Sequence, residues 1–289
     1  DLENAGAAPI SELWTIDGGT TGFADLGQTW SKMIRTKLRY GCDAADSIAG
    51  CTEKDVLVFS GGYDTYYDDS AQSFNGDAET TDIKGNAVYV VDALTGDLLW
   101  STGNAGSADN HLLSLPMYNS IPADPSPVDI DGDGDMDMLY FVDISGMVYR
   151  VDFDQTNALD SGYATGGVIA NLRESSVFRR FYNGLDVSLV TPTTSSSYLA
   201  ISVGSGYRAH PKEEETWANH FYVLVDENLY GPEEWGENNE GVNENTITYS
   251  YVKTYEEDGE GNPTSVIDSR DIIRIEDLHV YSGDDPYDK

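Results

Sequence analysis

The chain has 289 residues, of which 39% are hydrophobic, so it can bury a sizeable core as one large domain or as two smaller ones. Its 51 acidic residues against 16 basic ones give a formal net charge of −35, which argues strongly against nucleic acid or an anionic membrane as a partner and favours cations. No apolar run is long enough to span a bilayer, so we expect no direct membrane insertion.

The first predicted elements lie on either side of two cysteines. Residues 24–38 are expected to form a loop and a strand, and residues 55–65 a second strand that ends at paired glycines. Between them, Cys42 and Cys51 are close enough in sequence for a local disulfide, which would imply an oxidising compartment; the alternative is a pair of free thiols. The chain starts without a signal peptide, as expected of a mature form or of a part excised from a longer protein.

Strand follows strand along the chain, and helical periodicity is nowhere sustained. The candidates are rich in β-branched and aromatic residues: 56–63, 86–100, 138–153, 198–206, 220–230 and 244–255. Several share one design, in which an apolar strand is followed by an Asp, a turn of small residues and a second strand. This design predicts a hairpin whose turn begins at the Asp side chain, and it occurs in VYVVDALTGDLLW, LYFVDISGMVYRVD and FYVLVDENLYG.

The spacing of these hairpins predicts the architecture. The first two copies lie about fifty residues apart, which is the repeat length of a four-stranded propeller blade. We therefore predict an all-β fold, a modified β-propeller with a complete or an incomplete ring and long acidic loops, in which the chain would supply roughly five or six blades. A β-sandwich is the alternative. We expect one domain over residues 1–289, with residues 227–289 as its acidic, loop-rich C-terminal part.

A calcium-loop pattern precedes the strand that begins at residue 138. Asp residues occupy positions 1, 3, 5 and 9 of the pattern and a Gly occupies position 6, in Asp129, Asp131, Asp133, Asp137 and Gly134. Calcium takes about six to eight oxygen ligands, so several carboxylates must converge on it. A Gly at position 6 permits the sharp turn that brings the later ligands back toward the ion.

The rest of the pattern departs from a helix–loop–helix site. Asp135, at position 7, is expected to offer its backbone carbonyl, and at position 12 Tyr140 replaces the usual bidentate Glu. The loop therefore leads into a strand, and a remaining ligand must be water or a residue from elsewhere. The alternative is a solvated acidic turn, in which unpaired carboxylates would repel one another. We predict Ca²⁺ as the cofactor, bound at Asp129, Asp131, Asp133, Asp135 and Asp137.

The C-terminal part of the chain has a different composition. Beyond residue 226 it is dense in Glu, Asp, Asn and Gly. Residues 231–243 and 256–264 are expected to be exposed acidic loops, and a solvated surface explains their carboxylates better than a second metal site does.

The order of motifs along the chain resembles the C-terminal domain of PilY/PilC-type proteins, the tip-associated adhesins and assembly factors of type IV pili. The motifs that carry this resemblance cover most of residues 13–227: LGQTWSKM (26–33), VLVFSGGYD (56–64), VYVVDALTGDLLW (88–100), PSPVDIDGDGDMDMLYFVDISGMVYRVDF (125–153), ISVGSGYRAHP (201–211) and HFYVLVDE (220–227). The calcium loop with its strand and the GSGYRAHP segment are the more specific ones.

The resemblance implies a secreted propeller with a calcium site that regulates pilus extension and retraction and supports surface attachment. It further implies a place at the pilus tip or outer cell surface, reached through the periplasm. The expected partners are minor pilins or the pilus tip, and a host or abiotic surface. Matched position by position, the four Asp residues at positions 1, 3, 5 and 9 would be side-chain ligands and Asp135 the carbonyl ligand.

Two other function classes remain as alternatives. VDALTGDLLW also resembles the blade hairpin of quinoprotein dehydrogenases, but no segment can be identified as a quinone pocket. The four histidines show neither a nucleophile elbow nor a zinc spacing: His111, His210, His220 and His279. We therefore expect a protein that is not an enzyme. The third class is a purely structural assembly protein that uses calcium only for folding.

Overall fold

The computed structural model describes residues 12–43, 50–68, 83–160, 162–173, 179–193, 197–209, 219–226, 229 and 273–276. Within these residues the chain forms thirteen strands in three sheets, together with one short 3-10 helix, η2 (Thr65–Asp68). Three segments predicted from the sequence lie outside the described residues: the strand at 244–255 and the acidic loops at 231–243 and 256–264. The expected all-β fold is confirmed.

The first sheet contains β1 (Ile34–Tyr40), β2 (Thr52–Ser60), β3 (Ala87–Asp92), β4 (Leu98–Gly103) and β5 (Leu113–Ser114), hydrogen-bonded in that order. Its first four strands form an antiparallel meander, and β5 pairs in parallel with β4. The 86–100 hairpin is therefore confirmed as β3 and β4.

The second and third sheets are antiparallel meanders of four strands each. The second contains β6 (Ser126–Val128), β7 (Met138–Val142), β8 (Met147–Phe153) and β9 (Ala164–Asn171). The third contains β10 (Asp186–Val190), β11 (Tyr198–Gly204), β12 (His220–Asp226) and β13 (Ile273–Glu276). The last strand comes from the acidic C-terminal part and pairs with β12.

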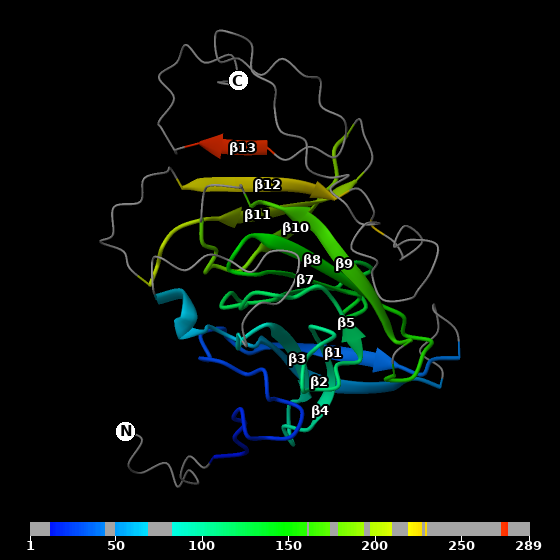
Figure 1. The fold of residues 1–289 in the computed structure, drawn as a ribbon. Helices are drawn as coiled ribbons and strands as arrows, with labels where there is room; N and C mark the ends of the chain where they lie inside the picture. The colour runs from blue at the N-terminus through cyan, green and yellow to red at the C-terminus, as the bar shows by residue number, and fades with distance from the viewer. Residues whose placement is uncertain are drawn as a thin grey trace, which may run out of the picture.

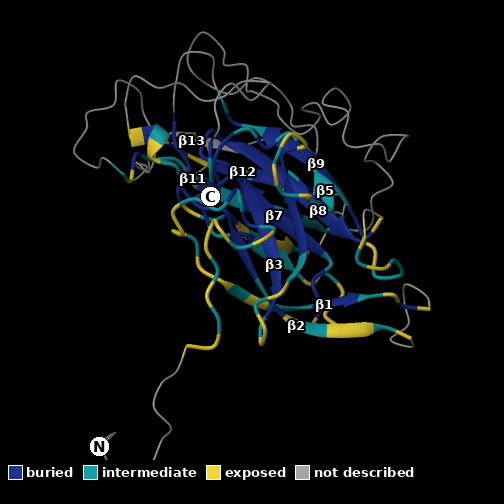
Figure 2. Cartoon of the chain, turned by 60° about the horizontal axis from the view of Figure 1, so that its bottom comes forward, coloured by how far each residue is buried: buried dark blue, intermediate teal, exposed yellow. Residues whose placement is uncertain are grey.

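The three sheets follow one another in chain order across the molecule, with the second sheet in the middle (Figure 1). Alternate residues of β7 and β8 point to opposite sides of this sheet. Leu139 and Phe141 join a core with Val56 and Val58 of the first sheet. Their neighbours along β7 join a second core with strand β11 of the third sheet. Figure 2 shows this middle layer as the most buried part of the chain.

Burial on both faces explains why MLYFV lacks the polar–apolar alternation of a half-exposed strand. Face-to-face packing of consecutive meanders is compatible with propeller blades and also with the sandwich alternative. The described residues form three sheets, whereas five or six blades were predicted for the whole chain. Long connections lengthen the units: the first sheet alone extends from Ile34 to Ser114.

Two of the three predicted Asp turns form as expected. Asp92 Oδ1 accepts hydrogen bonds from the amides of Leu94 (2.9 Å) and Thr95 (3.2 Å). Asp143 Oδ1 accepts from the amides of Ser145 (2.9 Å) and Met147 (3.0 Å). Such side-chain acceptors satisfy amides that a tight turn leaves unpaired.

The turn predicted after the third Asp, Asp226, lies largely outside the described residues, but the Asp226 side chain itself is described. The Asp226 carboxylate accepts hydrogen bonds from the Tyr140 hydroxyl (3.0 Å) and from Arg150 Nη1 (2.9 Å), both in the middle sheet. Arg150 also binds Asp152 of its own strand at 2.6 Å. This buried group links the third sheet to the second by ionic hydrogen bonds.

Because β7 is buried on both faces, truncating one of its core side chains should lower the free energy of unfolding. Phe141→Ala removes a side chain that is 0% exposed, and we expect a loss of about 3–5 kcal/mol in the free energy of unfolding. Leu94→Ala, at a turn position that is 73% exposed, is the control and should change the free energy by less than about 0.5 kcal/mol. Denaturant unfolding of both variants checks this, and equal losses would contradict the assignment of Phe141 to the core.

Candidate metal centre

The predicted calcium loop connects β6 to β7 and turns through two glycines. Gly132 and Gly134 both have positive φ angles, of 82° and 96°. An L-residue with a side chain rarely adopts this backbone conformation, whereas Gly adopts it at little cost. The requirement for Gly134 at position 6 is therefore visible in the backbone, and Gly132 adds a second left-handed turn that the sequence pattern did not identify.

Three of the four predicted side-chain ligands come together. Asp129, Asp131 and Asp137 each offer a carboxylate oxygen, and these atoms lie within 4.8 Å of one another. Convergent carboxylate oxygens are what a hard divalent cation requires. The cluster is partly exposed, because Asp129 and Asp131 are at the surface while Asp137 is half-buried.

Backbone amides orient the first ligands of the loop. Asp129 accepts from the amides of Gly132 (2.7 Å, at Oδ1) and Gly134 (2.9 Å, at Oδ2). Asp131 Oδ1 accepts from the amide of Asp133 at 3.0 Å. These bonds fold the loop around its first carboxylate without help from distant residues.

Asp137 is oriented by residues on both sides of it, from the loop after β6 and from the turn after β8. Its Oδ2 accepts from the amide of Ile130 at 2.8 Å, and its Oδ1 accepts from Nε2 of Gln155 at 3.1 Å. Its amide donates to the carbonyl of Val128 at 2.9 Å, and its carbonyl accepts from the amide of Phe153 at 2.9 Å. Asp137 is therefore held by the strands themselves, whereas Asp129 and Asp131 depend on the loop.

The electrostatics of Asp137 favour a positive ion. Burial raises the pKa of Asp137 to about 6, the hydrogen bond from Ile130 opposes this rise, and the charges of Asp131, Asp133 and Asp129 add to it. A bound cation would reverse the effect of the neighbouring charges. Protons and cations therefore compete for this carboxylate.

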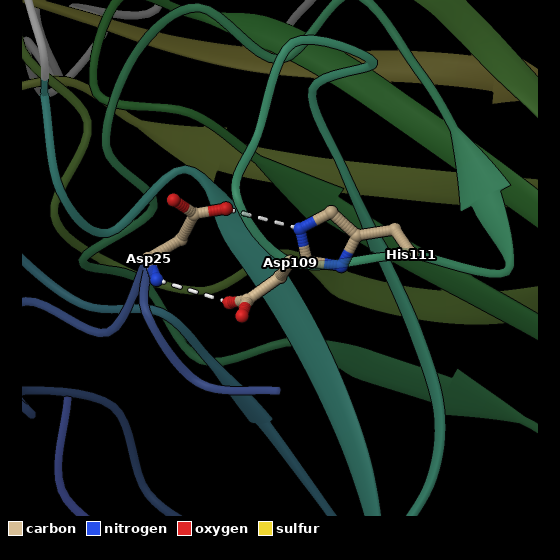
Figure 3. A group of neighbouring side chains, drawn as sticks. All are labelled: Asp25, Asp109 and His111. Atoms are coloured by element: carbon tan, nitrogen blue, oxygen red, sulfur yellow. Dashed lines mark hydrogen bonds and ion pairs between the residues drawn. The ribbon is translucent and has the colours of Figure 1, made fainter. Parts of the chain in front are cut away.

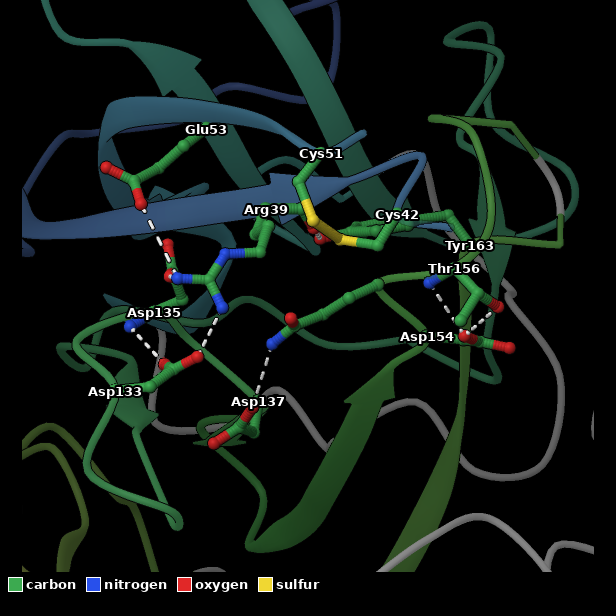
Figure 4. Close-up of a disulfide and its surroundings, with 11 residues drawn as sticks. Arg39, Cys42, Cys51, Glu53, Asp133, Asp135, Asp137, Asp154, Thr156 and Tyr163 are labelled. Carbon is green, nitrogen blue, oxygen red and sulfur yellow. Dashed lines mark hydrogen bonds and ion pairs between the residues drawn. A yellow bond between two sulfur atoms is a disulfide. The ribbon is translucent and has the colours of Figure 1, made fainter. Parts of the chain in front are cut away.

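The other two predicted ligands direct their carboxylates to an arginine (Figure 4). Arg39 of β1 is 7% exposed, and its guanidinium forms ion pairs with both Asp133 and Asp135. Asp133 was predicted to be a side-chain ligand, but its Oδ1 accepts from the Asp135 amide at 2.9 Å and its Oδ2 faces Arg39. Asp135 was predicted to contribute only its backbone carbonyl, and its side chain is fully buried against Arg39.

The pKa values of these two carboxyl groups shift in opposite directions. Burial works against ionisation of Asp133, but the Asp135 amide and the Arg39 guanidinium hold its pKa below the usual value. Burial raises the pKa of Asp135, and the charge of Arg39 opposes the rise. Asp133 can act as a cation ligand only if its carboxylate is shared with Arg39 or released from it, so its assignment as a ligand stays a prediction.

The disulfide predicted between Cys42 and Cys51 is confirmed and closes the connection between β1 and β2. Next to it, the amide of Cys42 donates to the carbonyl of Gln155 at 2.9 Å, and the amide of Gly41 donates to the carbonyl of Asn157 at 2.8 Å. The disulfide-bonded connection thus docks on the β8–β9 turn, which includes Asp154 and Thr156 (Figure 4). In the same turn, the Gln155 side chain orients Asp137. Disulfides of this kind are typical of oxidising compartments.

Sequence reasoning missed Arg39 and Gln155. For Arg39 a signal existed: Arg35, Lys37 and Arg39 alternate along β1 in a strongly acidic chain, so one face of this strand is basic. All three bind acidic partners, with Arg35 on Asp55 at 2.6 Å. No local pattern marks Gln155, because its partner Asp137 lies across the sheet.

Among the described residues, no helix is long and apolar enough to cross a membrane.

Comparisons with known proteins find likeness among solved structures. No family model matches the chain, and no curated protein matches it. Among solved structures, the chain is similar to the crystal structure of the Pseudomonas aeruginosa PilY1 C-terminal domain, with 17% sequence identity and a TM-score of 0.47. The match covers 74% of this chain and 40% of the solved one, so the chain spans less than half of that structure.

Removal of Arg39 tests the link between β1 and the loop. Arg39→Met leaves the buried Asp135 and the neighbouring Asp133 without their cation, and we expect a loss of roughly 3 kcal/mol in calcium-free protein. Arg35→Met is the matched control on the same strand, where the side chain is 71% exposed and its ion pair should contribute little. Denaturant unfolding with a chelator present measures both. Similar results for the two variants would mean that the buried ion pair does not support the loop.

Proposed function

We propose that the chain is a calcium-binding, non-enzymatic, pilus-associated protein that acts in type IV pilus assembly and retraction control and in surface adhesion. The observation that carries the calcium part is the convergence of the Asp129, Asp131 and Asp137 carboxylates on a loop that leads into a buried strand. Hard cations prefer oxygen ligands of this kind. Calcium fits better than magnesium, because calcium accepts several carboxylates in irregular geometry, whereas magnesium demands a near-ideal octahedral arrangement.

The pilus part of the proposal rests on the motif order along the chain, with the calcium loop and the GSGYRAHP segment as its more specific elements. The disulfide supports an extracellular or periplasmic location, because thiols in the cytosol are kept reduced. The proposed partners are minor pilins or the pilus tip, and a host or abiotic surface. Net charge makes electrostatic attraction to nucleic acid unfavourable.

The position of the loop suggests how calcium could affect the fold. Cation binding at Asp137 would act at the junction of β6, β7 and β8, where this residue bonds to Val128 and Phe153. The same loop docks on β1 through Arg39 and through the amide of Met136, which donates to the carbonyl of Lys37 at 3.0 Å. An ion bound here therefore stabilises the contact between the first and second sheets. This role is common to a regulatory adhesin and to a structural assembly protein.

Thermal unfolding with and without calcium tests the site. Calcium that binds only the folded state should raise the melting temperature, by the equivalent of about 2.7 kcal/mol when its concentration is a hundredfold above Kd. We expect the rise to disappear in Asp137→Ala and to be strongly reduced in Asp133→Ala. Asp135→Ala should unfold at a lower temperature because Arg39 loses a buried partner, but it should keep the calcium-dependent rise because its backbone oxygen remains.

The exposed turn residue Asp97 provides a control, since Asp97→Asn lies far along the chain from the loop and should leave the rise unchanged. Equal loss of the rise in Asp133→Ala, Asp135→Ala and Asp137→Ala would contradict the assigned register. No rise at millimolar calcium would mean that the cluster is a solvated acidic turn.

Cell binding separates adhesion from assembly. In a strain that keeps this protein at its surface but lacks the pilus fibre, we expect attachment to host or abiotic surfaces to persist and to fall when the Asp137→Ala variant replaces the parent. Surface amounts of parent and variant are matched by immunoblotting. Attachment that is lost with the fibre itself would leave an assembly role and remove the adhesin role.

A further inference from the structure

A second group of metal-ligating side chains lies at the opposite part of the first sheet from the calcium loop. Asp25 comes from the loop before β1, and Asp109 and His111 come from the connection between β4 and β5. One oxygen from each carboxylate and one ring nitrogen lie within 4.8 Å of one another. Figure 3 shows the Asp25 carboxylate facing the His111 ring and the Asp109 carboxylate facing the backbone nitrogen of Asp25.

Existing hydrogen bonds hold these side chains in place. Asp25 Oδ2 lies 3.0 Å from His111 Nε2, and Asp109 Oδ2 accepts from the amide of Asp25 at 3.1 Å. On its other side, His111 Nδ1 lies 2.9 Å from the Ser101 hydroxyl, which orients the ring. Ser107 binds Asp25 through its hydroxyl and also accepts from the amide of Asp109 at 2.9 Å. A ligand set oriented by outer hydrogen bonds is the usual arrangement around a protein metal ion.

The site is buried and closely packed. The side chain of His111 is 1% exposed and that of Asp25 is 8% exposed. The His111 ring lies against Gly103, where an added Cβ would meet Nε2 at 2.3 Å. Only a glycine at this position allows the ring to lie between strand β4 and the Asp25 loop.

An independent observation points to a missing ligand. Tyr89 of β3 is 0% exposed, and its hydroxyl forms no hydrogen bond of standard length and angle in the part of the chain that the structure describes. Its ring centroid lies 6.3 Å from that of His111. Burial raises the pKa of Tyr89, and the charges of Asp25 and Asp109 and a side-chain contact with Asp109 add to the rise, so this hydroxyl lies beside the proposed ligands. A buried hydroxyl without a well-formed hydrogen bond is costly, and metal-bound water or a metal-bound carboxylate would satisfy it.

We propose that Asp25, Asp109 and His111 form a second metal site, which binds a divalent transition-metal ion, with Zn²⁺ as the best-fitting cation, and fastens the loop before β1 to the first sheet. Imidazole nitrogen with two carboxylate oxygens is a donor set that suits zinc, whereas calcium takes oxygen ligands alone. Zinc bonds of about 2.0–2.1 Å place tetrahedral ligand atoms about 3.4 Å apart, so the three atoms need only small movements. Water completes the coordination and accepts the Tyr89 hydroxyl hydrogen bond.

The first test is isothermal titration of Zn²⁺ into zinc-free protein. Saturating Ca²⁺ is present throughout and keeps the calcium loop occupied. We expect one zinc site and a zinc-dependent rise in melting temperature. The same zinc site is expected in Asp137→Ala, so failure of the calcium proposal and failure of this one are distinguishable. Absence of zinc binding by the parent protein overturns the proposal.

The informative variant is Asp109→Asn, because its amide oxygen can still accept the hydrogen bond from Asp25 and the fold is preserved. Loss of an outer-shell partner costs about 10–100-fold in metal affinity, so loss of this ligand should weaken zinc binding at least about tenfold. Asp124→Asn is the matched control: Asp124 also accepts a backbone amide from the segment before β1, that of Lys32 at 2.6 Å. The control should bind zinc like the parent, and equal zinc affinity in the two variants overturns the proposal.

Discussion

Burial of β7 and β8 on both faces is the constraint on which the candidate calcium site depends. These strands pack against the first sheet on one side and the third sheet on the other, so neither strand can shift without opening a core. Asp137 immediately precedes β7, and its backbone is bonded to Val128 and Phe153. The backbone of Asp137 is therefore held by the neighbouring strands, and its carboxylate is oriented by Gln155 and by the amide of Ile130 in the loop. A loop fixed at one ligand needs to order only its remaining ligands when a cation binds, which lowers the entropic cost of binding.

The acidic residues of the loop fall into two groups. Arg39 neutralises Asp133 and Asp135 from within the protein, on the side of the loop that packs against β1. The carboxylates of Asp129, Asp131 and Asp137 face the other way and have no such partner in the described residues. This division separates a permanent structural ion pair from a site that is open to a cation. It also explains why a sequence pattern with five acidic residues can serve packing and binding at once.

Local sequence patterns predicted most of the strands and the hairpin turns. The turns at Asp92 and Asp143 followed from single side chains that bond to amides a few residues away. Patterns of this kind do not reveal contacts made over a long distance, such as those of Asp226 with Tyr140 and Arg150 across two sheets. The described residues form three sheets, and the long connections within a sheet, such as those that extend the first sheet from Ile34 to Ser114, are not encoded in the hairpin repeat.

Sequence by itself determined the all-β class, the disulfide between Cys42 and Cys51, and the loop whose spaced carboxylates make a cation site plausible, because each depends on residues close together in the chain. Only the tertiary structure decided which carboxylates converge, since Arg39 reaches Asp133 from a strand 94 residues earlier. The same holds for the group of Asp25, Asp109 and His111: His111 lies 86 residues from Asp25, so no spacing rule could detect it. Side-chain charge and turn preference are local properties, whereas the meeting of charges from different strands is fixed by how the sheets pack.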